Sequence, residues 1–156
     1  MERSRFYRAK LAGCDPQTGL ARIAELPLTE KRELKETRTA ENPIGAHLCV
    51  DRSALVRIYS TSGTTGSPSY VPLTASDLGN WVTGSARSYG AAGLGPGDVV
   101  LTTYNAGPFV AGAALDAFAR LGVCHVPVGT GASERLLRAI EELRPDAVVL
   151  TPSYAA

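Results

Sequence analysis

The sequence predicts an α/β fold, a mostly parallel sheet flanked by helices, with a β-hairpin ahead of it in the chain. Short apolar strands begin near Val99, Val123 and Ala147, at equal spacing, and a helical stretch follows each of the first two. Parallel strands need a crossover of a dozen or more residues, usually a helix, and these intervals have that length. The hairpin is predicted from two strand-like runs, 55–61 and 69–73, which enclose a stretch of small residues.

The chain before the hairpin is its least regular part. Residues 3–11 favour one short helix by the spacing of their apolar side chains. The stretch 30–36, EKRELKE, consists of strong helix formers and follows Thr29, a good N-cap residue, so we expect a second short helix there. We therefore divide the chain into an irregular N-terminal helical segment, 1–53, and an incomplete α/β subdomain, 54–156.

Three longer helices are predicted after the hairpin. Thr74 and Asp77 have the spacing of a capping box, with Asp in place of the usual Glu, and the helix that follows is expected to end at Gly90 or Gly93. Two more helices lie between the parallel strands, over 109–121 and 133–143, and should pack on the sheet. In the last of them, four apolar residues are expected to share one face: Leu136, Leu137, Ile140 and Leu143.

Composition argues against several classes of partner. Lys and Arg total 16 against 15 for Asp and Glu, so no net field favours nucleic acid or a membrane surface. No apolar run is long enough to span a bilayer, and the N-terminus has no apolar signal core.

The three cysteines, Cys14, Cys49 and Cys124, are odd in number and far apart, which favours buried, reduced thiols in a cytoplasmic protein. His47 and His125 have no ligand spacing with any cysteine, so we expect no metal site.

The stretch TSGTTG, 61–66, between the two hairpin strands is suited to an anion. Gly63 and Gly66 let the backbone turn so that successive N–H groups point at one centre. Hydroxyl donors are added by Ser62, Thr64 and Thr65. The Walker pattern of P-loop NTPases is absent, because no Lys follows the second glycine and no helix starts there. A plain surface hairpin is the alternative, although one glycine would suffice for it.

The segment STSGTTGSP, 60–68, resembles the phosphate-binding motif of the adenylate-forming enzymes, the superfamily of acyl-CoA synthetases. Its flanks are similar, in the same order, to segments of the phenylacetate–CoA ligase family: LPLTEKRELKE, RSYGAAGLGPGDVVLTTYNAGPF and GTGASERLLRAIEELRPDAVVLTPSYA. The resemblance covers nearly all of the chain. It implies part of the large N-terminal domain of an adenylate-forming enzyme, with 54–156 as an incomplete AMP-binding subdomain and the hairpin carrying the phosphate loop.

The resemblance also implies a two-step reaction. ATP and Mg²⁺ let a carboxylate attack the α-phosphate, which gives an acyl-adenylate and pyrophosphate, and the thiol of coenzyme A then displaces AMP. By the family's pattern the β- and γ-phosphates would be held by Thr61, Ser62, Gly63, Thr64, Thr65 and Gly66. Many members carry Lys where this chain has Ser67, so a point charge is missing and we expect weaker ATP binding.

The resemblance places two aromatic residues, Tyr104 and Phe109, in the acyl pocket. A flat apolar wall there would suit an aryl or arylacetic acid as the small-molecule carboxylate substrate. For Phe109, which begins a predicted helix, a place in the core is an equally good interpretation.

Members of the family continue into a Mg²⁺-binding acidic residue and a lid domain with a catalytic lysine, and we assign no catalytic residue to these 156 residues. We expect the chain to be the N-terminal part of an ATP-dependent acid–CoA ligase and to be inactive by itself. The alternative is a non-catalytic module that binds a nucleotide or a protein partner, and an α/β protein without a ligand is a third reading. An open sheet edge leads us to expect a homodimer or a strand swap.

Overall fold

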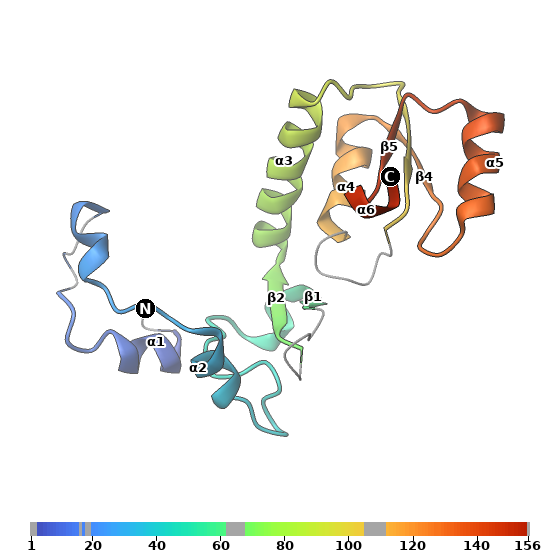
Figure 1. The fold of residues 1–156 in the computed structure, drawn as a ribbon. Helices are drawn as coiled ribbons and strands as arrows, with labels where there is room; N and C mark the ends of the chain where they lie inside the picture. Colours follow the sequence, from blue (N-terminus) through green and yellow to red (C-terminus); the bar gives the residue numbers. More distant parts are fainter. Residues whose placement is uncertain (1–2, 16, 18–19, 62–67, 105–111, 156) are drawn as a thin grey trace.

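The computed structural model describes residues 3–15, 17, 20–61, 68–104 and 112–155. Its elements are α1 (Arg5–Lys10), η1 (Leu20–Glu25), α2 (Lys31–Glu36), η2 (Arg52–Ala54), β1 (Leu55–Ser60), β2 (Tyr70–Thr74), α3 (Ala75–Ala91), β3 (Val99–Thr102), α4 (Gly112–Leu121), β4 (Cys124–Pro127), α5 (Ser133–Leu143), β5 (Ala147–Val149) and α6 (Pro152–Ala155). α2 lies near the hairpin of β1 and β2 and η1 lies further from it, whereas α3 leads from this hairpin to the α/β unit (Figure 1).

The α/β unit contains a parallel sheet in the order β4-β3-β5. In the central strand, Val99 pairs with Cys124 of β4, and Val100 pairs with Ala147 of β5. The helices α4 and α5 form the two crossovers, which confirms the predicted fold class. Each parallel strand also begins within one residue of its predicted start.

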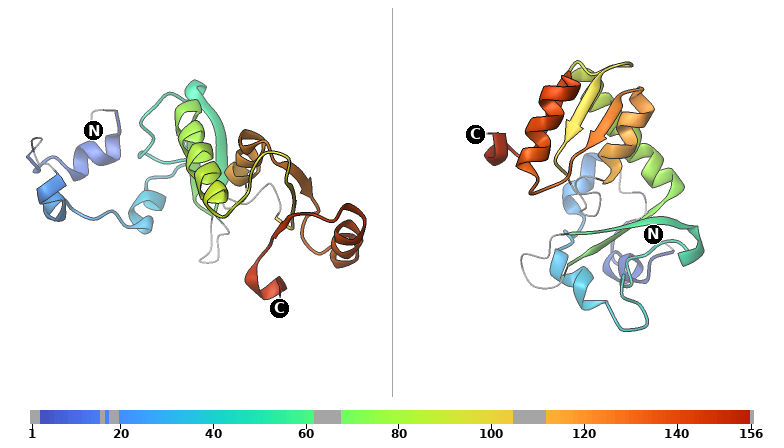
Figure 2. Two further views of the ribbon diagram at one scale, coloured as in Figure 1. Left: turned by 90° about the horizontal axis from the view of Figure 1, so that it is seen from above. Right: turned by 90° about the vertical axis from the view of Figure 1, so that its right-hand side faces the viewer.

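Helices cover both faces of this sheet. Val100 and Leu101 are fully buried and, as neighbours on a strand, point to opposite faces. Val100 packs with Phe118 of α4, whereas Leu101 packs with Leu136 of α5. The sheet therefore lies between α5 on one side and α3 with α4 on the other, as both views of Figure 2 indicate.

Of the four apolar residues expected to share one face of α5, only two pack against the sheet. Leu136 is 7% exposed and Ile140 packs against the same cluster, but Leu137 and Leu143 are 61% and 51% exposed. The described sheet has three short strands, so it covers a narrow stripe of the helix. Leu137 and Leu143 lie outside that stripe.

The hairpin and α3 follow the sequence pattern closely. β1 and β2 pair antiparallel, with Tyr59 opposite Val71. The capping box at Thr74 is confirmed, because its Oγ1 accepts from the Asp77 N–H at 3.2 Å and its N–H donates to Asp77 Oδ2 at 3.0 Å. Gly93 has φ +101°, a conformation that favours glycine, so it is the residue that ends the helix.

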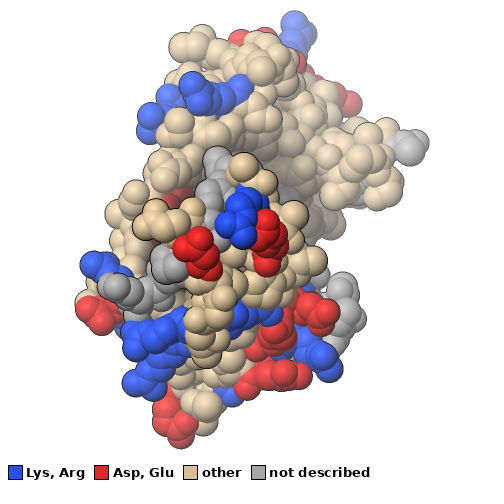
Figure 3. Space-filling model, turned by 90° about the vertical axis from the view of Figure 1, so that its left-hand side faces the viewer, with Lys and Arg blue, Asp and Glu red and all other residues tan. Residues whose placement is uncertain are grey.

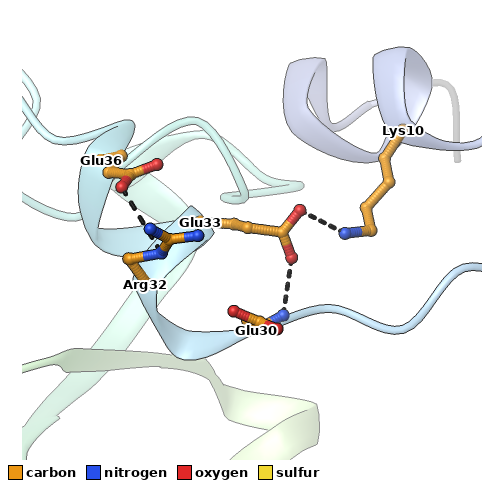
Figure 4. A network of polar contacts seen from close by, with 5 residues as sticks. All are labelled: Lys10, Glu30, Arg32, Glu33 and Glu36. Carbon is orange, nitrogen blue, oxygen red and sulfur yellow. Dashed lines mark hydrogen bonds and ion pairs between the residues drawn. The ribbon is translucent and has the colours of Figure 1, made fainter.

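The N-terminal helices are held together by a small polar network (Figure 4). The predicted N-cap of α2 was wrong by one residue, because Glu30 rather than Thr29 occupies that position. The Glu30 N–H donates to Glu33 Oε2 at 2.6 Å, and Lys10 of α1 forms an ion pair with the same carboxylate. A glutamate can serve at this end of a helix because its carboxylate and that of Glu33 face unpaired backbone N–H groups.

Charged side chains of both signs lie next to one another on the face shown in Figure 3, mainly over its lower half. This mixture matches the balanced composition and gives no large field of one sign on that face. None of the described helices combines the length and the apolar character that a bilayer span requires.

Candidate functional site

The base of the predicted phosphate loop is closed by two hydrogen bonds between its ends. The Thr61 N–H donates to the Ser69 carbonyl oxygen at 2.9 Å, and the Ser69 N–H donates to Thr61 Oγ1 at 2.9 Å. Thr61 therefore uses its amide and its hydroxyl oxygen to hold the stem. The other five predicted phosphate ligands, Ser62, Gly63, Thr64, Thr65 and Gly66, lie outside the described residues, as does Ser67.

Arg38 holds the C-terminal end of the predicted phosphate loop, at Pro68. Both of its terminal guanidinium nitrogens donate to the carbonyl oxygen of Pro68, with Nη1 at 2.7 Å, and the group lies 5.3 Å from the centre of the Tyr70 ring. This arrangement fixes the position of the charge, because the planar guanidinium is held by the two hydrogen bonds that it donates and by contact with an aromatic face. No local pattern predicts this role, since Arg38 lies in the irregular N-terminal segment.

The hairpin stem packs tightly on α4. A Cβ atom added at Gly112, the first residue of α4, would lie 2.1 Å from Tyr59 Cε1 and 2.2 Å from its hydroxyl oxygen. Only a glycine allows this approach. The Tyr59 ring is 4% exposed and also meets Trp81 of α3 edge to face, with 5.5 Å between ring centres.

A charged contact reinforces the same junction. Arg57 of β1 forms an ion pair with Asp116 of α4, and its Nη1 also donates to the Tyr59 hydroxyl at 3.0 Å. These hydrogen bonds, first that to Tyr59 and then that to Asp116, raise the pKa of Arg57. The pair is partly exposed, so its main effect is to orient the stem relative to α4.

Tyr104 lies just beyond the carboxyl end of β3, where ligands bind in many parallel α/β sheets. The Tyr104 side chain is half-buried. Burial of Tyr89, and then the neighbouring Tyr104, raise the pKa of the Tyr89 phenol. Phe109, the second predicted pocket residue, lies outside the described part of the chain. Tyr104 thus lies at this edge of the sheet, and its role in an acyl pocket stays a prediction.

The two residues before Tyr104 in the chain, Thr102 and Thr103, are buried and polar. Thr102 is fully buried, and its Oγ1 lies 2.9 Å from His125 Nε2. The imidazole of His125 packs 5.0 Å from the Phe118 ring centre, and burial lowers its pKa. This histidine therefore has a structural contact inside the unit, and it stays neutral at physiological pH.

Metal ligation has no support among the residues that the structure describes, where no group of three or more His, Cys, Asp or Glu could hold an ion. The cysteine prediction was wrong in part: Cys49 and Cys124 are exposed, and only Cys14 is partly covered. Cys124 is exposed because it lies on β4, an outer strand of the described sheet.

No family model matches the chain. Individual relatives do. The chain is 38% identical to the phenylacetate–coenzyme A ligase of Thermus thermophilus over 99% of its own length, and 35% identical to that of Pseudomonas putida over 96%. Over nearly its whole length the chain is therefore similar to phenylacetate–CoA ligases. It spans about a third of the length of those relatives, 35% and 34% respectively.

Solved structures place the phenylacetate–CoA ligase homologue among adenylate-forming ligases. The 2-hydroxyisobutyryl-CoA ligase in complex with 2-HIB-AMP and CoA, in the thioesterification state, matches 99% of this chain with a TM-score of 0.88 and 32% identity. An open conformation of that ligase, also with 2-HIB-AMP and CoA, gives a TM-score of 0.86 at 29% identity. The chain covers 34% and 35% of those proteins, so the match concerns their N-terminal third.

Proposed function

We propose that this chain is the N-terminal part of an ATP-dependent acid–CoA ligase and that it has no ligase activity by itself. The observation that carries the proposal is the alignment of 99% of the chain with ligases that bind an acyl-adenylate and CoA. The chain covers about a third of each, so groups needed for catalysis would have to come from the rest of such a protein.

The phosphate loop is the part of the reaction that this chain would contribute. In the proposal, Thr61 to Gly66 hold the β- and γ-phosphates, and ATP supplies the adenylyl group when bound. Thr61 would contribute its hydroxyl hydrogen, because its amide is bound to the Ser69 carbonyl oxygen and its hydroxyl oxygen accepts from the Ser69 N–H. Backbone N–H and hydroxyl donors offset the charge that develops on the leaving pyrophosphate. The closed stem at Thr61 and Ser69 and the anchored carbonyl of Pro68 support this role, because a preorganised loop loses less freedom when it binds an anion.

Tyr104 and Phe109 are proposed to line the acyl pocket of an aryl or arylacetic acid. The relatives named for phenylacetate favour such an acid, whereas the similar solved structures are named for 2-hydroxyisobutyrate. Tyr104 lies at the carboxyl edge of the sheet, where an aromatic ring would provide a flat wall for the acid. We also propose that Mg²⁺ takes part, held by residues of the longer protein.

The open edge of the sheet is proposed to pair with a second copy of the chain. β4 and β5 are the outer strands of the described sheet, and such edges template association. Val148 of β5 is exposed and adds apolar surface to this outer strand.

Exchange of labelled pyrophosphate into ATP, dependent on a carboxylic acid, tests the ligase proposal. We expect none from the 156-residue chain, and exchange when the chain replaces the matching third of the Thermus thermophilus relative in a fusion. In that fusion Thr65→Val should lower the exchange rate at least tenfold, whereas Thr83→Val, on the exposed side of α3, should not change it. Exchange by the isolated chain, or an inactive but folded fusion, would refute the proposal.

A further inference from the structure

The outer edge of β1 is an unpaired strand edge. The hairpin is a sheet of two strands, so β1 has β2 on one side and no other strand of the described residues on its second side. With six residues, β1 is also the longest of the described strands. A hairpin of two strands is marginal by itself, and an unpaired edge templates the addition of a further strand.

The pairing of β1 with β2 shows which backbone groups point away from the hairpin. The Thr61 N–H donates to the Ser69 carbonyl oxygen at 2.9 Å, so these two residues form a hydrogen-bonded pair of the ladder. In an antiparallel ladder such pairs alternate with pairs whose N–H and C=O groups point outward. Ile58 and Ser60 belong to the outward-pointing set. Within the described part of the chain, no backbone hydrogen bond uses the N–H or C=O group of either residue. We call these groups the β1 edge.

The other outer strands are less suited to pairing. Pro72 of β2 lies opposite Ile58, so it occupies an outward-pointing position of β2 and has no N–H to donate there. A proline at such a position interrupts a ladder on that side. In the parallel sheet the outer strands are shorter, with four residues in β4 and three in β5. The β1 edge is therefore the longest edge that can continue a ladder.

The side chains of β1 also leave one face of the hairpin uncovered. Tyr59 points to the face that packs on α3, where it is 4% exposed and meets Trp81. Ile58 points to the opposite face and is 45% exposed, and Val56 of the same strand is 55% exposed. Exposed apolar side chains next to unpaired backbone groups are what a neighbouring strand would cover.

A small cavity of about 260 Å³ lies against this uncovered face. Its apolar lining comes from the segment before the hairpin and from the hairpin itself: Pro43, Ile44, Leu48, Ile58 and Tyr70, with Glu41, Asn42 and Arg52 completing it. The volume lies below the roughly 300–1,000 Å³ of small-molecule sites, and it suits a single large side chain. In a strand paired with β1, the side chain opposite Ile58 would lie about 5 Å from it on this same face.

We propose that the β1 edge pairs with one extended strand from the remainder of a longer ligase. Ile58 and Ser60 exchange main-chain hydrogen bonds with that strand, and one of its large apolar side chains enters the cavity beside Ile58. The inference rests on the proposed function, because the chain spans about a third of the ligases that it resembles and the strand comes from the rest of such a protein.

Hydrogen exchange at single-residue resolution tests this proposal. It is measured on the 156-residue chain and on its fusion to the rest of the Thermus thermophilus relative. In the isolated chain the Ile58 and Ser60 amides should exchange like exposed backbone, and in the fusion at least roughly a hundredfold more slowly. The Tyr59 amide, which faces β2, is the internal control and should be protected in both proteins.

A lysine at Ile58 provides a second measurement. Ile58→Lys should lower the urea midpoint of the fusion clearly more than that of the isolated chain, because the charge would lie within the new contact. Ile23→Lys, at a residue of η1 that is 59% exposed, is the matched control and should have the same small effect in both.

Unprotected Ile58 and Ser60 amides in a folded fusion would overturn the proposal. Protection in the isolated chain that rises with protein concentration would also overturn it, because the edge would then belong to a second copy. If the fusion does not fold, the aligned amides of the intact Thermus thermophilus relative give the same decision. Protected amides in a fusion that does not exchange pyrophosphate would refute the ligase function alone, whereas unprotected amides in an active fusion would refute the strand alone.

Discussion

Arg38 donates two hydrogen bonds to the carbonyl oxygen of Pro68, a residue thirty positions further along the chain. The contact joins the irregular N-terminal segment to the end of the predicted phosphate loop. Pro68 lacks an N–H, and its carbonyl oxygen is the one acceptor that its backbone offers. The loop therefore depends on a residue that no local pattern marks as part of a site.

Removal of the Arg38 contact should loosen the loop. We expect Arg38→Gln to lower the free energy of unfolding by about 1 kcal/mol and to weaken ATP binding severalfold. Arg38→Lys keeps the charge but cannot match the two-donor geometry, so it should recover ATP affinity only in part. Urea unfolding and calorimetry with ATP measure both effects. Arg22→Gln, which removes an exposed pair with Glu25, is the matched control and should leave ATP binding unchanged.

The approach of Gly112 to Tyr59 predicts a sharp steric effect. Gly112→Ala should lower the free energy of unfolding by about 1–3 kcal/mol, because the new methyl group overlaps the phenol ring. Gly79→Ala, in the middle of α3 with nothing within 4 Å of a Cβ, should instead raise it by roughly 0.5–1 kcal/mol. Chemical denaturation measures both. Adding Tyr59→Leu to Gly112→Ala should cost less than the sum of the two changes, and strict additivity would count against the overlap.

Local patterns predicted most of the fold. Thr74 and Asp77 reveal a helix start because capping depends on residues three positions apart. The range of α5, Ser133–Leu143, was predicted correctly for the same reason, since its apolar spacing and the proline after it are local. These features need no knowledge of distant segments.

The site contacts between distant segments could not be predicted in this way. Arg57 and Asp116 are separated by 59 positions, and their pairing depends on how α4 packs against the hairpin. The exposure of Leu137 likewise follows from the width of the sheet, which the helical period does not contain. Tertiary packing therefore decided the parts of the site that the sequence left open.

Burial of the two histidines predicts a loss of stability in mild acid. Burial lowers the pKa of His47 and of His125, so the unfolded chain binds more protons as pH falls through about 6.5. The stability contributed by the neutral imidazoles is complete above that pH and is lost as pH falls from about 6.5 toward the lowered pKa values of the folded chain. The effect is separate from that of carboxylates such as Asp77, whose hydrogen bonds lower their pKa and matter only below about 4.

Urea unfolding at pH 7, 6 and 5 measures this loss. His125→Gln should reduce its steepness, because an amide can keep the contact with Thr102 but does not titrate. A wild-type chain of constant stability across this range would contradict the role of burial. An unchanged slope in His125→Gln would assign the effect to His47 alone.

The two sides of α5 predict opposite responses to truncation. Leu136→Ala should lower the free energy of unfolding by about 2–4 kcal/mol, since this side chain is 7% exposed and packs on the sheet. Leu137→Ala, at 61% exposure, should stay within about 0.5 kcal/mol of the parent chain. Thermal and urea unfolding of both variants give the comparison. Equal losses would mean that Leu137 is covered in solution, for example by a second copy of the chain.

The proposed pairing of sheet edges predicts an association that depends on β5. We expect dimers in light scattering coupled to size-exclusion chromatography, with the dimer fraction rising with protein concentration. Val148→Lys places a charge on the outer strand and should shift the chain to monomer, because lysine on an edge strand opposes pairing. Val56→Lys changes an equally apolar and more exposed residue of the hairpin and should leave the dimer intact. A parent chain that remains monomeric at all concentrations would exclude the edge contact, and loss of the dimer with Val56→Lys alone would place the interface on the hairpin instead.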